Sequence, residues 1–123
     1  MTPREILGRL DDGSLDPAGF SHRDHVRAAH EALRQDEFFA ATARFAAGLR
    51  RLTERAGVPE KYSATITFAF MSLIAERMAR DPGQDAEAFL AQNPDLLAGG
   101  LVARHYAPDR LATPLSRHVA LMP

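Results

Sequence analysis

Along most of this chain, apolar residues recur every three or four positions, while proline and glycine interrupt the pattern at short intervals. This spacing places apolar side chains on one face of an α-helix, whereas a half-buried strand would need strict alternation. The longest uninterrupted segment, from Pro59 to Arg80, predicts the most buried helix. Its residues 65–70 alternate as a strand would, but the length of the segment favours a helix. The spacing therefore predicts an all-α fold.

Capping residues and breakers mark the ends of the other predicted helices. Thr2 and Glu5 form a capping-box pattern around Pro3, and Ser21 with Asp24 is typical of a second helix start. The predicted helices span residues 3–12, 22–35, 36–57, 59–80, 85–92 and 96–105.

The segment after Tyr106 contains three prolines and predicts an ordered tail with one short turn. Four apolar residues of the tail are expected to pack back onto the helices: Leu111, Leu115, Val119 and Leu121. We expect one helical domain over residues 1–123. Its predicted architecture is a small antiparallel bundle of five or six helices with an ordered, proline-containing C-terminal tail.

The composition limits the classes of function. The chain has 123 residues, a formal net charge of −1 and no cysteine. The near-neutral charge gives no general attraction to nucleic acid or to anionic membranes, so we expect neither as a partner. The lack of cysteine excludes disulfides, thiolate nucleophiles and thiolate metal ligands. Because no apolar segment approaches the ~20 residues that a membrane span needs, we expect a cytoplasmic protein.

Three of the five histidines fall between residues 22 and 30. His22 and His25 stand three residues apart at a predicted helix start, so their side chains are neighbours leaning toward its buried side. The positive end of the helix dipole disfavours protonation, and neutral imidazole is the form that binds metals or accepts protons. We therefore predict that His22 and His25 form half of a metal or acid–base site, with a divalent transition metal as candidate cofactor. The alternative is a solvated, purely structural helix start. His30 is expected at the rim.

Tyr62 is the candidate catalytic partner of the two histidines. If the first turns of the second and fourth predicted helices lie side by side, its ring can pack while its hydroxyl reaches the same pocket. Thr65 is a candidate ligand-binding residue, although a helical threonine commonly bonds back to its own backbone.

Further candidate binding residues lie at the end of the sixth predicted helix, at Arg104, His105 and Tyr106. His105 and Tyr106 either close the pocket or fill the core beneath the tail, and the sequence leaves both open. A separate basic cluster lacks interleaved aromatic residues, which favours a solvated face over a nucleic-acid groove. Its members are Arg44, Arg50, Arg51 and Arg55.

Four short motifs occur in a fixed order over most of the chain. They consist of Phe20, His22, His25 and Val26; Lys61, Tyr62 and Thr65–Thr67; Asn93–Leu97; and Arg104–Tyr106. In this order they resemble a family of short, uncharacterised bacterial proteins, which implies an all-helical fold. Many members of that family place His-Glu directly after the tyrosine, which would add nitrogen and oxygen ligands beside the paired histidines. Here Ser63 and Ala64 occupy those positions, so the resemblance implies only half of such a metal site.

Two functions fit these residues. The first is a small-molecule site, with or without enzymatic chemistry, in which His22 or His25 is a base or ligand and Tyr62 donates a hydrogen bond. The second is a non-catalytic interaction or accessory protein, such as a homodimer, in which the histidines are structural. The docking surface would then be apolar residues of the third predicted helix: Phe38, Phe39 and Phe45. No glycine-rich phosphate loop, His-Glu-x-x-His, Gly-x-Ser-x-Gly or EF-hand loop is present to name a reaction.

Overall fold

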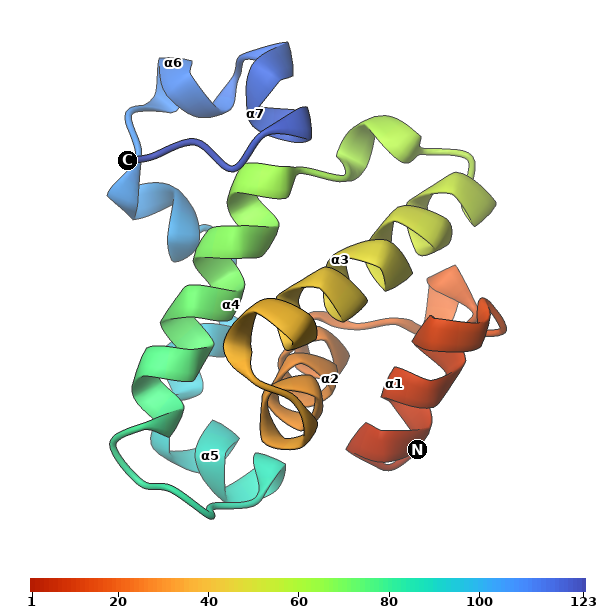
Figure 1. Cartoon of the computed structure of the whole chain (residues 1–123), viewed down its shortest axis with the longest axis vertical. Coiled ribbons are helices and arrows are strands. Elements are labelled where there is room, and N and C mark those ends of the chain that lie inside the picture. Colours follow the sequence, from red (N-terminus) through yellow and green to blue (C-terminus); the bar gives the residue numbers. More distant parts are fainter.

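The computed structural model describes all residues from Met1 to Pro123, and every regular element is helical (Figure 1). The predicted all-α class is confirmed. The α-helices are α1 (Pro3–Asp12), α2 (His22–Gln35), α3 (Phe38–Arg55), α4 (Ala64–Met78), α5 (Ala86–Gln92), α6 (Pro108–Leu111) and α7 (Pro114–His118). Short 3₁₀ turns lie between them: η1 (Pro17–Gly19), η2 (Pro59–Lys61), η3 (Pro94–Leu97) and η4 (Val102–His105). No helix combines the length and the apolar character that crossing a membrane requires.

Helix α2 occupies the centre of the structure, where it contacts α1, α3, α4 and α5. Its inner positions Ala28, Ala29 and Ala32 are fully inaccessible, and their small side chains let neighbouring helices approach closely. Large apolar side chains of the surrounding helices complete the core: Ile6, Leu7, Leu10, Phe45, Met71, Ile74, Phe89 and Leu90. The expectation that the fourth helix is the most buried is wrong, because Ile66 and Phe68 of α4 are 44% and 36% exposed.

Local capping signals determine where α1 and α2 begin. The Thr2 hydroxyl accepts a hydrogen bond from the backbone N–H of Glu5 at 3.1 Å, and the Glu5 carboxylate accepts one from Thr2. The same reciprocal pair joins Ser21 and Asp24 at the start of α2, with distances of 3.1 and 3.3 Å. Both predicted helix starts are confirmed. The capping boxes satisfy backbone N–H groups that lack a partner within the helix.

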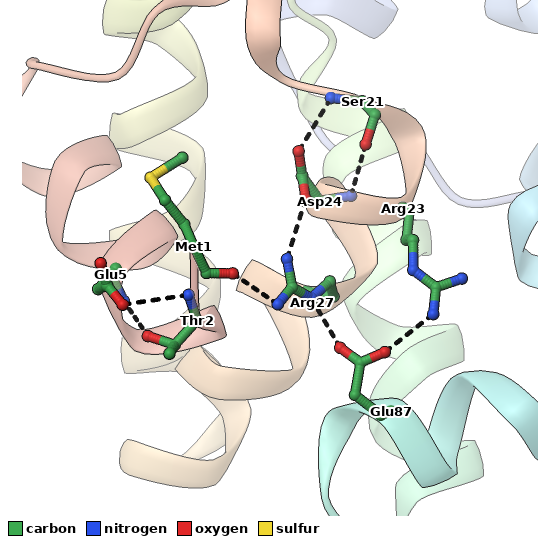
Figure 2. Close-up of polar contacts among 8 residues, drawn as sticks. All are labelled: Met1, Thr2, Glu5, Ser21, Arg23, Asp24, Arg27 and Glu87. Carbon is green, nitrogen blue, oxygen red and sulfur yellow. Dashed lines mark hydrogen bonds and ion pairs between the residues drawn. The ribbon is translucent and has the colours of Figure 1, made fainter.

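Arg27 connects the first turns of α2 to two other elements (Figure 2). Its guanidinium donates to Asp24 of the capping box at 3.2 Å and to the Met1 carbonyl at 2.6 Å. A third bond reaches Glu87 of α5 at 2.9 Å, and Arg23 donates to the same carboxylate at 2.8 Å. The start of α2 is thereby held against the N-terminus and α5.

Helix α4 begins at Ala64, later than predicted. Pro59 instead opens η2, and Tyr62 and Ser63 follow it in extended conformations. Ser63 caps α4 by accepting a hydrogen bond from the backbone N–H of Ile66 at 3.2 Å. The predicted start is wrong because proline suits the first position of a 3₁₀ turn as well as that of an α-helix. Residues 65–70 are helical, as predicted.

The predicted helix over residues 96–105 is absent. The short turns η3 and η4 occupy its two ends, and Gly99 and Gly100 lie between them. Gly100 has a φ angle of +82°, in the left-handed region that glycine enters without steric cost. A residue in that conformation ends any α-helical path, so the segment is irregular.

The C-terminal tail forms two short helices, α6 and α7, rather than one turn, and α7 packs on α4 (Figure 1). Hydrogen bonds hold the tail, because the buried Thr65 hydroxyl donates to the Val119 carbonyl at 2.7 Å and accepts from Leu121 N–H at 3.0 Å. The Tyr106 hydroxyl donates to the Leu121 carbonyl at 3.1 Å. The expected packing of Leu115 and Val119 onto the helices is wrong, since they are 56% and 46% exposed.

Replacing Gly48 tests the close packing of α3 on α1. A Cβ atom at Gly48 would stand 2.5 Å from Cγ of Leu10, so Gly48→Ala forces Leu10 to move. We expect a loss of about 1–3 kcal/mol in the free energy of unfolding, measured with urea. Gly8 on α1 is the control, because its added Cβ meets no atom within 4 Å. Gly8→Ala should stabilise the protein by about 0.5–1 kcal/mol, and stabilisation by both changes would contradict this packing.

Replacing Thr65 tests the attachment of the tail. Thr65→Val keeps the side-chain shape but removes the hydroxyl that bonds Val119 and Leu121. We expect a loss of about 1–3 kcal/mol in stability and faster amide hydrogen exchange at Leu121. Thr65→Ser retains the hydroxyl and should preserve most of the protection of that amide. Unchanged exchange at Leu121 in the valine variant would refute the attachment.

Candidate functional site

The first turn of α2 presents two imidazoles next to aromatic neighbours. The His25 ring stacks on Phe20, with ring centroids 4.1 Å apart and planes 24° apart. The His22 ring lies 5.9 Å from that of His25 and 6.3 Å from that of Phe70 on α4, measured between centroids. His25 is partly buried, whereas His22 is exposed. The predicted neighbourhood of the two rings is therefore present, but only His25 is sheltered from solvent.

His25 and Tyr62 share a cavity of about 250 Å³, here called the His25 pocket. Residues of α2, α3, α4 and the segment before α4 line it: His22, His25, Phe45, Leu49, Thr53, Lys61, Tyr62, Ser63, Ile66, Thr67 and Phe70. The sequence predicts that Tyr62 faces the paired histidines, and in the structure Tyr62 lines the same cavity as both of them. It does so from the extended segment between η2 and α4, and not from a helix turn.

Burial lowers the pKa of His25 from 6.5 to about 4. Desolvation is the largest cause, the nearby His22 adds to it, and the Asp24 carboxylate acts in the opposite direction. At neutral pH the His25 ring is therefore uncharged, with one nitrogen that donates and one that accepts. No protein group hydrogen-bonds to the ring of His22 or His25 or to the Tyr62 hydroxyl. These groups remain available to a ligand.

An apolar cavity of about 150 Å³ adjoins the His25 pocket. His22, Ile66 and Phe70 line both cavities. The remaining lining comes from α4, η3 and the segment around η4: Leu73, Leu96, Ala98, Gly100, Leu101, Val102 and Ala103. The combined hollow has polar side chains at the Tyr62 end and an apolar surface at the other.

The residues around His22 and His25 offer few ligands for the predicted metal site. No group of three or more His, Asp or Glu side chains is placed to hold a metal ion. Ser63 caps α4 through its hydroxyl, and Ala64 offers no donor, so neither completes the pair of His22 and His25. Protein metal sites of the zinc type use at least three protein ligands. The residues present do not form such a site.

The other predicted binding residues lie outside the His25 pocket. The Thr65 hydroxyl bonds to the tail rather than to its own helix or to the pocket. Arg104 and His105 are exposed at the end of η4. Tyr106 fills the core beneath the tail and does not close the pocket, because its ring is buried under the C-terminal segment. These side chains hold or flank the C-terminal segment.

His30 was expected at a rim, but it is only 2% exposed. Its ring lies 5.1 Å from that of Phe89, between centroids, and its Nδ1 has no hydrogen-bond partner. Burial lowers the pKa of this imidazole. It also lines a separate cavity of about 390 Å³ beside the Pro82–Gln84 loop. The expectation is wrong because α5, distant in sequence, covers this part of α2.

Sequence reasoning missed two residues next to the site. The sequence pattern places Arg50 on a solvated face, yet its guanidinium carbon lies 5.8 Å from the centre of the Tyr62 ring. Arg117 reaches the same region from α7 and donates to the Pro59 carbonyl at 3.4 Å. Nothing in the linear pattern joins residues 50, 62 and 117, since only the fold of the tail brings them together.

Comparisons of the chain with protein-family models, with curated proteins and with solved structures find no match.

The lowered pKa of His25 predicts a specific acid sensitivity. Since its pKa is about 4 in the folded protein and 6.5 unfolded, the unfolded chain binds more protons between these values. The contribution of the neutral His25 ring to the free energy of unfolding is therefore complete above pH 6.5, the pKa of the unfolded chain. It is lost as the pH falls to about 4, the pKa in the folded protein, and the loss is at most about 3 kcal/mol. His25→Gln should therefore lose less stability than the parent between neutral and acidic pH in urea unfolding. The exposed His105→Gln serves as control and should follow the parent, and identical pH profiles for all three proteins would contradict the burial.

Proposed function

We propose that this protein binds a small organic molecule in the His25 pocket. The observation that carries the proposal is the convergence of His22, His25 and Tyr62 on one cavity, with their polar atoms free of protein partners. Ligand pockets are typically apolar cavities in which a few polar groups fix orientation. The apolar cavity beside Phe70 provides room for a larger, apolar part of the ligand.

The three polar residues have different roles in this proposal. His25 acts as a neutral imidazole that donates one hydrogen bond to the ligand and accepts another. Its low pKa makes it a weak base, and general bases work best with a pKa near the working pH, so we assign it to binding. Tyr62 donates a hydrogen bond from its hydroxyl. His22 lies at the exposed edge of the pocket, where its imidazole adds a further hydrogen-bonding group.

The alternative, an interaction protein, has weaker support. Of the three phenylalanines proposed for docking, Phe45 is fully buried in the core and Phe38 is partly buried. Only Phe39 stands out, with 71% of its surface exposed, packed edge-on against Phe38 at 5.2 Å between centroids. Phe38 also contacts Phe68 of α4, which is 36% exposed, at 5.9 Å between centroids, so the exposed surface is a small aromatic patch. Small apolar patches are common on soluble proteins, so this surface does not favour a partner over a ligand.

A fragment screen with small aromatic molecules tests the binding proposal. We expect neutral aromatic and heteroaromatic fragments such as benzyl alcohol and indole to shift the ring resonances of His25 and Tyr62 in NMR spectra. The double variant His22→Ala/His25→Ala and the single variant Tyr62→Phe should weaken this binding, because each removes a hydrogen-bonding group from the pocket. His105→Ala is the matched control and should bind like the parent.

The thermal midpoint of each variant distinguishes lost binding from lost folding. A folded double variant that binds every fragment as well as the parent would refute the proposal, as would a parent whose His25 and Tyr62 resonances never move. Retained binding in His105→Ala, with loss in the double variant, would support it.

A further inference from the structure

Tyr62 also lines a second cavity, of about 260 Å³, here called the arginine pocket. Helix α3, the segment around η2 and the tail helix α7 surround it. Its polar lining consists of Arg50, Thr53, Glu54, Tyr62, Arg117 and His118. Two of these residues, Thr53 and Tyr62, also line the His25 pocket, so the two cavities share a wall.

The guanidinium groups of the arginine pocket lack anionic partners. The Arg50 guanidinium makes no hydrogen bond or ion pair and lies over the Tyr62 ring. Arg117 uses one N–H for the Pro59 carbonyl, while its Nε is buried with no partner. Four arginines that contact other elements are instead paired with carboxylates: Arg23, Arg27, Arg44 and Arg77. Arg51 and Arg55 donate to backbone carbonyls at the C-terminal end of α1. The carboxylate-paired Arg77 also has a buried Nε without a partner, so what distinguishes Arg50 and Arg117 is that neither guanidinium has a carboxylate partner. An oxyanion would provide one.

The charge around the two cavities is positive although the whole chain has a net charge of −1. The lining of the two cavities includes three cationic residues: Arg50, Arg117 and Lys61. It includes one carboxylate, that of Glu54. No carboxylate lines the His25 pocket itself. Such an imbalance raises the local concentration of anions, and a planar guanidinium matches the geometry of carboxylates and phosphates.

We propose that the ligand of the His25 pocket is an organic anion whose carboxylate or phosphate group is bound by Arg50 and Arg117. The inference rests on the proposed function and adds the chemical class of the ligand. Tyr62 lines both cavities, with Arg50 over its ring and with His25 among the residues that line the other cavity. The uncharged part of the ligand lies beside His25, and the anionic group lies among the arginines.

Three matched probes test the class of ligand: phenyl phosphate, benzoate and the neutral benzyl alcohol, each added at constant ionic strength. NMR signals of the arginine Nε–H groups report on the arginine pocket, and the ring signals of His25 report on the His25 pocket. We expect at least one of the two anions to shift the signals of Arg50, Arg117 and His25 together. Whichever of phenyl phosphate and benzoate binds more tightly identifies the anionic group. Inorganic phosphate alone should shift the arginine signals without those of His25.

Substitutions at Arg50 are the decisive variants, because this side chain is exposed and bonds to nothing whose loss would unfold the protein. Arg50→Ala should weaken binding of the anionic probe about tenfold, Arg50→Glu should weaken it more, and Arg50→Lys should retain part of it. Arg80→Ala, another exposed arginine that lines neither cavity, should leave the affinity unchanged. Arg117→Lys tests whether the guanidinium of Arg117 also takes part in binding the anionic probe.

The outcomes separate this inference from the proposed function. Equal affinity for benzyl alcohol and for both anions, or equal loss in Arg50→Ala and Arg80→Ala, would overturn the anion assignment while leaving binding at His25 intact. Inorganic phosphate that shifts the arginines, with no probe ever reaching His25, would refute the proposed function and with it a ligand that spans both cavities.

Discussion

The hydrogen bonds between Ser21 and Asp24 fix where α2 begins, and the candidate site depends on that start. Arg27 extends the constraint, because one guanidinium joins Asp24, the Met1 carbonyl and Glu87 of α5. The first turn of the central helix is therefore held from two sides. Since its two histidines follow the cap directly, their direction is set by the same bonds. The capped first turn of α2 therefore positions both imidazoles.

The site combines two electrostatic environments separated by Tyr62. On the α2 side, burial against Phe20 keeps His25 uncharged, so the cavity offers hydrogen bonds without a formal charge at that point. On the α7 side, Arg50 and Arg117 carry positive charges that no carboxylate neutralises. A ligand that matched both environments would need an anionic group and a neutral part. This asymmetry connects the proposed binding site with the proposed class of ligand.

Predictions from the sequence succeeded where the deciding interaction lies within a few residues. The start of α2 follows from Ser21 and Asp24, and the proximity of His22 and His25 follows from their spacing on one helix. They failed where one residue type permits two local structures, as Pro59 opens a 3₁₀ turn instead of α4. Predictions also failed where a segment distant in sequence determines burial. His30 is buried because Phe89 of α5 packs against it.

By itself, the sequence determined the all-α class, the starts of the capped helices and a pair of imidazoles at one helix end. Those features follow from hydrogen bonds and side-chain spacing within single turns. Only the tertiary structure decided that Thr65 anchors the tail and that Arg117 reaches the cavity beside Tyr62. The reason is that packing brings together residues that are far apart along the chain. No local sequence pattern specifies which of those side chains will line the same cavity.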